Sequence, residues 1–103
     1  MAIETIPRGS REYLSVVVEG DSSVTSLSVE MAVLAYGTRP ADSDWQAAEW
    51  DVDDGDGAIV AKILIGPGTS FDFSLTPGTK VPWARVAAGQ EEPEMEGEPF
   101  QIT

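Results

Sequence analysis

Apolar and polar residues alternate along much of this chain with the period of two that is typical of half-buried β-strands. In EYLSVVVE, residues 12–19, the apolar face consists of Leu14, Val16 and Val18. In VTSLSVEMAVLA, residues 24–35, it consists of Leu27, Val29, Met31 and Val33. The segment GDSS between them, residues 20–23, has the composition of a turn. These two segments therefore predict a β-hairpin.

Three more strands are predicted in the second half of the chain. AIVAKILI, residues 58–65, is apolar on both faces and predicts a central strand that ends at GPG, residues 66–68. SFDFSL, residues 70–75, predicts a strand that ends at TPG, residues 76–78. KVPWARVAA, residues 80–88, predicts an edge or bulged strand because Pro82 cannot donate a hydrogen bond to a neighbour.

The chain closes on EPFQIT, which predicts a short last strand with Phe100 and Ile102 facing inward. The acidic segment GQEEPEMEGEP, residues 89–99, predicts an exposed loop before it. SDWQAAEW could form a single helical turn capped by Ser43 or Asp44, and no segment shows a sustained helical period.

Short strands with Gly and Pro between them predict an all-β fold, a small antiparallel immunoglobulin-like β-sandwich of six to seven strands. A chain of 103 residues provides one domain. We expect residues 1–11 to form an extended N-terminal arm and residues 12–103 to form the β-sandwich domain. The Cys…Trp…Cys spacing of antibody domains is absent, because the chain has no cysteine.

Composition narrows the possible functions. With no histidine and no cysteine, the chain lacks the usual general base, nucleophilic triads and the common zinc ligands. We therefore expect neither enzyme activity nor a cofactor. A net charge of −12 repels phosphate, so we expect no direct nucleic-acid binding and no membrane binding. The first residues, MAIETIPRGSREY, lack the basic and apolar regions of a signal peptide.

EWDVDDGDG, residues 49–57, gathers four aspartates and is the clearest candidate for a metal site. Counted as a calcium loop from Asp51, it has Asp56 where the loop needs glycine and Lys62 where it needs a bidentate acid. The pairs Asp54-Gly55 and Asp56-Gly57 instead favour hairpin turns. We expect a solvated turn over residues 51–56, with a weak cation site as the alternative. The alternating glutamates of residues 91–98 predict a charged loop rather than a rigid catalytic pair.

Six residues are candidates for partner binding. If Pro82 and Ala84 face inward, Trp83 and Arg85 point outward together, as in an interface hot spot. The alternative is an arginine stacked on a neighbouring ring at the surface. The other four candidates lie in the N-terminal arm: Ile3, Ile6, Arg8 and Arg11. Trp45 and Trp50 could form an aromatic platform for a carbohydrate.

The order PRGS, LSVVVEG, GTRPADSDWQAAEWD, AKILIGPG, LTPGTKVPWARV, PE and GEPFQIT resembles a family of small Ig-like β-sandwich proteins. These are encoded in the virion structural gene blocks of phages that infect actinobacteria. The resemblance covers residues 7–103, and its motifs are structural. Two features depart from the family pattern: Lys80 replaces a tyrosine, and PWARV replaces VWVRV.

The resemblance implies a non-enzymatic virion protein, most simply a capsid decoration or minor capsid protein that docks on the major capsid protein. A head–tail connector or a tail or baseplate component is the alternative within the same class. A carbohydrate-binding β-sandwich is the alternative from another class. The resemblance further implies a homo-oligomer or contacts with other virion proteins, and localisation to a virion assembled in the host cytoplasm. The two departures from the family pattern, at Lys80 and in PWARV, together favour cover of this face by a neighbouring chain.

Overall fold

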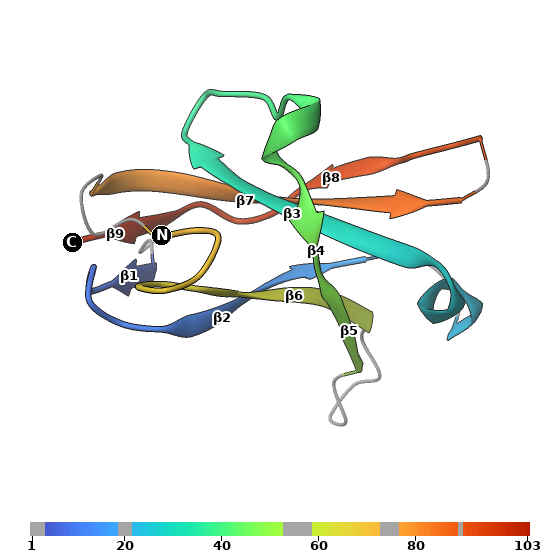
Figure 1. The fold of residues 1–103 in the computed structure, drawn as a ribbon, viewed down its shortest axis with the longest axis horizontal. Helices are drawn as coiled ribbons and strands as arrows, with labels where there is room; N and C mark the ends of the chain where they lie inside the picture. Colours follow the sequence, from blue (N-terminus) through green and yellow to red (C-terminus); the bar gives the residue numbers. More distant parts are fainter. Residues whose placement is uncertain (1–3, 19–21, 53–58, 73–76, 89) are drawn as a thin grey trace.

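The chain forms a two-layered β-sandwich, seen from the side in Figure 1. This computed structural model describes residues 4–18, 22–52, 59–72, 77–88 and 90–103. Their strands are β1 Glu4–Ile6, β2 Glu12–Val17, β3 Ser28–Ala35, β4 Gln46–Ala47, β5 Glu49–Val52, β6 Ile59–Ile65, β7 Gly78–Ala87, β8 Glu94–Glu96 and β9 Phe100–Ile102. Two short 3-10 helices, η1 Ser22–Ser26 and η2 Asp42–Asp44, are the only helical turns in that part of the chain. The predicted all-β sandwich is confirmed.

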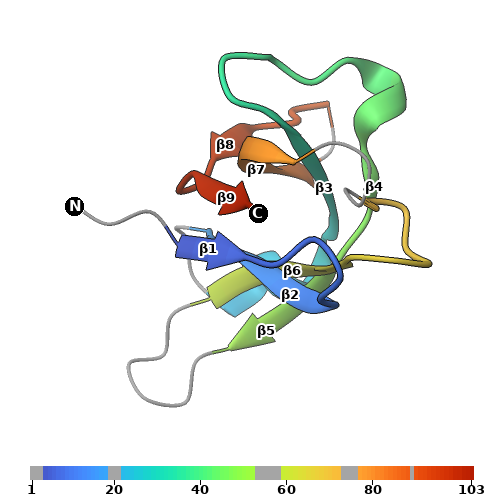
Figure 2. The ribbon, with the colours of Figure 1, turned by 90° about the vertical axis from the view of Figure 1, so that its left-hand side faces the viewer.

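The strands form two sheets that lie face to face (Figure 2). The larger sheet has the order β1-β9-β7-β3-β4, with β8 also paired to β7, and the smaller sheet has the order β2-β6-β5. In immunoglobulin lettering, β2, β6 and β5 take the places of strands B, E and D, and β3 and β7 those of C and F. Figure 1 shows β4 and β5 following one another from the larger sheet to the smaller.

Two apolar clusters fill the space between the sheets, and both arise from the alternating faces of the strands. The first contains Ile6, Leu14, Val33, Ile65, Phe71, Phe100 and Ile102. The second contains Val16, Val18, Val29, Met31, Ala61, Ala84 and Val86. Ile63 packs against both clusters, so they form one continuous core. The inward faces predicted for the strands of residues 12–19, 28–35 and 100–102 are therefore correct.

The predicted hairpin between the first two long strands is wrong. β2 pairs with β6 in the smaller sheet, whereas β3 pairs with β7 and β4 in the larger one. The two strands lie in different sheets, and the apolar face of each contributes to the core between the sheets. The connection between β2 and β3 contains η1. Leu27, which follows η1, packs against the second core cluster. A period of two tells which face is buried, but not which strand is the neighbour.

Of the two situations expected for Pro82, an edge strand or a local bulge, the edge strand is wrong, because β7 is central. β7 pairs with β3 on one side and with both β8 and β9 on the other. The Pro82 carbonyl accepts a hydrogen bond of 2.8 Å from the Gly97 N–H, where the chain bulges between β8 and β9. Because the amide nitrogen of a strand residue faces the same side as its carbonyl, Pro82 nitrogen faces this bulge. The N–H that proline lacks is therefore not needed, because Pro82 lies between the part of β7 that pairs with β8 and the part that pairs with β9.

Residues 4–6 of the predicted N-terminal arm belong to the sandwich as β1. β1 pairs in parallel with β9, from Glu4↔Phe100 to Ile6↔Ile102. This pair is the one departure from an antiparallel sandwich among the described strands. Ile6 is 1% exposed and packs in the first core cluster. A boundary between residues 11 and 12 therefore does not separate an arm from a domain.

The strand count exceeds the predicted six to seven because β1, β4 and β8 have only two or three residues. A period cannot be recognised over such short segments. Glu94–Glu96 was expected to be loop but forms β8. Phe71 and Asp72 were expected in a strand but lie outside one, although Phe71 is buried. The predicted helical turn forms earlier than expected, at Asp42–Asp44, where the Asp44 carboxylate accepts a hydrogen bond from the Ala41 N–H.

Candidate functional site

The outer face of the larger sheet is covered by the chain itself. The connection between β3 and β4, residues 36–45, folds over it and inserts Trp45, which is 6% exposed. Trp45 packs there with Ala32, Val81 and Trp83 in a third apolar cluster, separate from the main core. This side of the sandwich therefore has its own small core.

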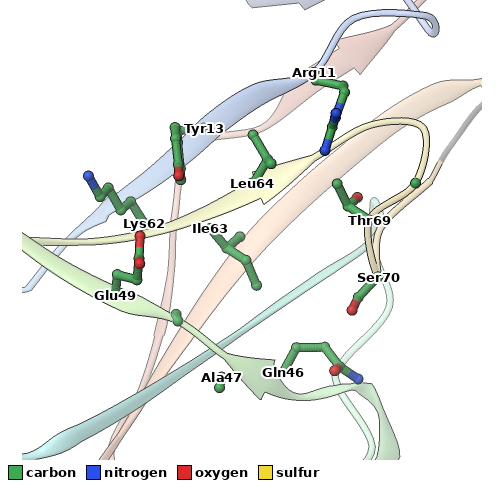
Figure 3. Close-up of a pocket in the computed structure, with 12 residues that line it drawn as sticks. Arg11, Tyr13, Gln46, Ala47, Glu49, Lys62, Ile63, Leu64, Thr69 and Ser70 are labelled. Atoms are coloured by element: carbon green, nitrogen blue, oxygen red, sulfur yellow. The ribbon is translucent and has the colours of Figure 1, made fainter.

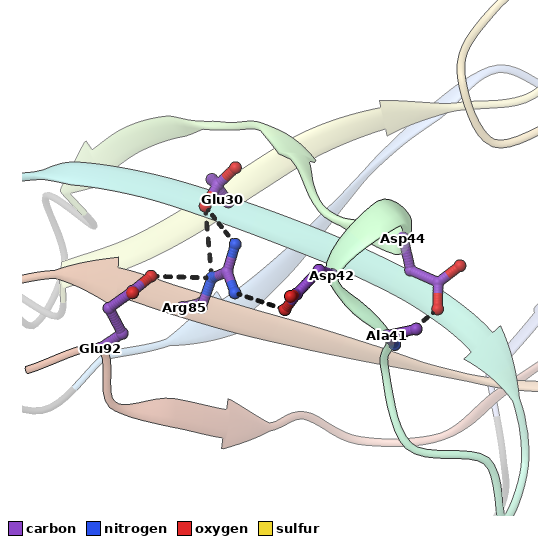
Figure 4. Close-up of polar contacts among 6 residues, drawn as sticks. All are labelled: Glu30, Ala41, Asp42, Asp44, Arg85 and Glu92. Atoms are coloured by element: carbon purple, nitrogen blue, oxygen red, sulfur yellow. Dashed lines mark hydrogen bonds and ion pairs between the residues drawn. The ribbon is translucent and has the colours of Figure 1, made fainter.

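Arg85 is at the centre of the polar contacts on this outer face of the larger sheet (Figure 4). Its guanidinium donates two hydrogen bonds to Glu30 Oε1, of 2.8 and 3.3 Å. It also forms ion pairs with Asp42 at 3.8 Å and Glu92 at 3.5 Å, and it stacks 4.6 Å from the centre of the Trp45 ring. The hydrogen bond to Glu30 raises the pKa of Arg85 against the lowering effect of burial, and the three carboxylates add to the rise.

The predicted Trp83–Arg85 pair points away from the main core but is not open to a partner. Trp83 is 9% exposed and the Arg85 side chain is 16% exposed. Arg85 stacks on Trp45 rather than on Trp83, whose ring is approached by Arg39 at 6.0 Å. Arg85 therefore joins β3, η2 and the segment before β8. These contacts give the arginine a structural role in a mostly buried strand.

Trp83 Nε1 is buried and has no hydrogen-bond partner among the described residues. A pocket of about 200 Å³ next to the ring is lined by Gly37, Thr38, Arg39, Val81, Trp83 and Glu96. Glu96 is directly opposite Trp83 in the pairing of β7 with β8, so both side chains lie on the same face.

The structure separates the other predicted partner-binding residues from one another. Ile6 lies in the core. The Arg8 main-chain N–H and side-chain Nε both donate to the Thr103 carbonyl, at 2.9 and 3.3 Å. Arg11 is exposed and lies beside Tyr13 at the edge of a shallow pocket. Ile3 lies outside the described residues.

Trp45 and Trp50 do not form an exposed aromatic platform. Trp45 is buried against the larger sheet. Trp50 points into the sandwich, where it packs against the second core cluster, and its Nε1 donates a 2.8 Å hydrogen bond to the Leu27 carbonyl. The two rings therefore lie in different layers, and this removes the basis for the carbohydrate-binding alternative.

Residues 53–56 of the turn predicted over residues 51–56 lie outside the described residues, and its first two residues, Asp51 and Val52, belong to β5 instead of a turn. Asp51 forms a 3.6 Å ion pair with Lys62 of β6. Over the described part of the chain, no group of three or more Asp, Glu, His or Cys side chains is placed to hold a metal ion. Nor does any helix in that part have the length and apolar character needed to cross a membrane.

The outer face of the smaller sheet is different, because no described segment folds over it. Its side chains come from β2, β6 and β5 and are Tyr13, Ser15, Val17, Glu49, Asp51, Val60, Lys62 and Leu64. Tyr13 is 55% exposed and Val17 is 62% exposed. Figure 3 shows Tyr13, Lys62 and Glu49 on adjacent strands at one end of this face, where Lys62 Nζ lies 4.9 Å from the centre of the Tyr13 ring.

A shallow depression of about 570 Å³ lies beside this row, with Gln46, Thr69 and Ser70 on its far side (Figure 3). Sequence reasoning did not select this face as a site. The sequence feature that could have indicated this face is the set of outward-facing residues in EYLSVV. Tyr13 and Val17 occupy positions there at which a solvent-exposed strand usually has charged residues.

Two comparisons with known proteins were negative. No family model matches the chain, and no curated protein matches it. The resemblance to phage sandwich proteins therefore stays a prediction from the sequence.

Proposed function

We propose that the chain is a non-enzymatic structural protein of a phage virion. Within that class we favour a capsid decoration, or minor capsid, protein that docks on the major capsid protein and stabilises the head. The proposal places it in the virion, assembled in the host cytoplasm, in many copies or as a homo-oligomer.

The observation that carries the proposal is the open outer face of the smaller sheet. Tyr13 and Val17 expose more than half of their surface there, and exposed tyrosine and aliphatic side chains on a flat sheet are typical of protein-binding surfaces. The other sheet is already covered by the connection of residues 36–45. A sandwich with one covered and one open face is suited to lying flat on another protein.

Net charge supports a protein partner over nucleic acid. A charge of −12 repels the phosphate backbone and favours a basic protein surface, with faster association at low salt. The sequence similarity described above adds the virion setting. It does not distinguish the capsid surface from a head–tail connector or a tail component.

Particle composition tests this proposal. Phage particles made from a genome that encodes this chain would be purified, and each protein quantified by mass spectrometry against the major capsid protein. Hundreds of copies in a particle are expected for decoration. A dozen or fewer would favour a connector or tail component, and absence from the particle would refute the virion proposal.

A matched pair of variants tests the surface. Changing both Tyr13 and Val17 to Ser should lower binding to particles at least about tenfold, because the two side chains supply the exposed apolar area. Tyr36→Ser is the control. Tyr36 is 69% exposed, but it directly follows β3 of the larger sheet and so is not on the outer face of the smaller sheet. Equal binding by both variants in a sedimentation assay would show that docking uses another surface.

A further inference from the structure

One long side of β2 has no neighbouring strand in the part of the chain that the structure describes. β2 pairs with β6 over its whole length, from Glu12↔Ile65 to Val17↔Val60, and it is the terminal strand of the smaller sheet. The backbone groups on its other side are therefore available to a further strand.

The register identifies these groups. The Val18 N–H donates a 2.9 Å hydrogen bond to the Ile59 carbonyl, so residues 18 and 59 form a hydrogen-bonded pair. In antiparallel strands such pairs alternate along the ladder. Val16 and Leu14 therefore also face β6, whereas the N–H and carbonyl groups of Tyr13, Ser15 and Val17 face the free side.

This edge differs from the other sheet edges. Proteins usually protect an edge strand by making it very short or by placing charges or proline on it. β1, β4 and β8 have three residues or fewer, and β5 carries Glu49 and Asp51. β2 has six residues, and at its free positions it presents Tyr13, Ser15 and Val17 with no charge among them.

A groove with an acidic rim runs along the free side of β2. It has a volume of about 190 Å³ and is lined by Ser15, Val16, Val17, Glu96, Gly97 and Glu98. Glu96 ends β8, and Gly97 and Glu98 follow it in the bulge between β8 and β9, where Gly97 approaches Val16 closely. A methyl group on Gly97 would lie 2.9 Å from Val16 Cγ2. Both Glu96 and Glu98 are exposed beside the groove.

We propose that the free edge of β2 accepts an extended segment of a partner protein as an added strand, and that this segment carries Lys or Arg residues. Main-chain hydrogen bonds to Tyr13, Ser15 and Val17 would provide the binding geometry. Pairing of the basic side chains with Glu96 and Glu98 would provide the preference for charge. A second copy of this chain is a poor occupant, because each copy carries a charge of −12.

This inference deepens the proposed function, on which it rests, by naming the kind of segment through which a partner docks. It can nevertheless fail separately. Particle composition reports on the virion role whatever happens at β2. Binding of a peptide to β2 reports on the edge whether or not the protein is found in a particle.

The probe is a synthetic peptide of alternating Lys and Thr residues, compared with one in which Glu replaces every Lys. Nuclear magnetic resonance would follow amide hydrogen exchange in the whole chain. The Lys peptide should slow exchange of the Tyr13, Ser15 and Val17 amides at least tenfold and leave Leu14 and Val16, already bonded to β6, unchanged. The Glu peptide should have no effect. Equal effects of the two peptides, or no effect of the Lys peptide, would overturn the proposal.

Ser15→Pro tests the edge directly. Proline removes the N–H that faces the free side and no hydrogen bond to β6, so the sandwich should remain folded while peptide affinity falls at least tenfold. Ser15→Val keeps the N–H and should bind like the parent. Should Ser15→Pro not fold, the Glu96→Gln and Glu98→Gln double variant must lower affinity for the Lys peptide in its place. Unchanged binding of the Lys peptide by a folded Ser15→Pro variant would contradict the inference. Protection of the Tyr13, Ser15 and Val17 amides that rises with protein concentration in the absence of peptide would contradict it as well.

Discussion

Ile6 provides the sharpest test of whether the N-terminal segment is part of the fold. Its side chain is 1% exposed and contacts a cluster formed by β2, β3, β6 and β9. Replacing a buried isoleucine by alanine costs about 2–5 kcal/mol. We expect about 3 kcal/mol for Ile6→Ala, since β1 is a short strand at the end of its sheet and can partly close the cavity. For a chain of this size, that is a large part of a total stability of roughly 5–15 kcal/mol.

Removing residues 2–8 should have a larger effect than Ile6→Ala. The deletion also removes the hydrogen bonds from Thr103 N–H to the Ile6 carbonyl, 3.0 Å, and from Arg8 N–H to the Thr103 carbonyl, 2.9 Å. At about 1 kcal/mol each, these bring the expected loss to about 5 kcal/mol. A truncated chain should then be only marginally folded, contrary to what a free arm would give.

Urea unfolding followed by tryptophan fluorescence measures these differences. Thr5→Ala is the control, because Thr5 is in the same strand but exposed, and it should stay within about 0.5 kcal/mol of the parent. Ile6→Ala should also lower the melting temperature by roughly 15 °C. If Ile6→Ala unfolds at the same urea concentration as Thr5→Ala, β1 is not packed in the core and the reasoning fails.

Three other predictions follow from particular contacts. Gly97→Ala should destabilise the chain by about 1–3 kcal/mol, because the added methyl group meets neighbouring atoms at 2.9 to 3.2 Å. Gly9→Ala is the control, because a methyl group there has no atom within 4 Å. Equal melting temperatures of the two variants would contradict this prediction. Arg85→Met should cost about 2 kcal/mol because it removes the charge-assisted hydrogen bonds to Glu30, whereas Arg39→Met should be nearly neutral. The difference in urea midpoint should be the same at pH 6 and pH 9, since the raised pKa keeps Arg85 charged throughout. Residues 51–57 should show no binding heat with micromolar calcium in isothermal titration, and a saturable signal there would revive the metal-site interpretation.

Sequence patterns were sufficient for the fold class and for most of the buried faces. Alternation in residues 12–18 and 28–33 correctly assigned Leu14, Val16, Met31 and Val33 to the core. The reason is that neighbouring side chains of a strand always point to opposite faces. Glycine and proline at residues 66–68 also marked the end of β6 correctly, since Gly66 and Gly68 have φ values of 117° and 83° that other residues rarely adopt.

Neither the pairing of the strands nor the covering of the outer faces could be predicted from the alternating pattern. A strand with one apolar face can pack across the core from its successor as well as beside it, and β2 and β3 do the former. Likewise, the outward position of Trp83 follows from alternation, but its burial depends on a connection that begins more than 40 residues earlier in the chain and places Trp45 over it. Contacts between distant segments are decided by packing of the whole domain, not by local preference.

The candidate surface shows the same division. The sequence determined by itself that Tyr13, Ser15 and Val17 share a face opposite to the core, because the period of the strand requires it. Only the tertiary structure decided that this face stays open while the equivalent face of the larger sheet is covered, and that the edge of β2 borders the acidic bulge at Glu96 and Glu98. Local periodicity fixes the direction of a side chain, whereas its exposure depends on which distant segments come to lie over it.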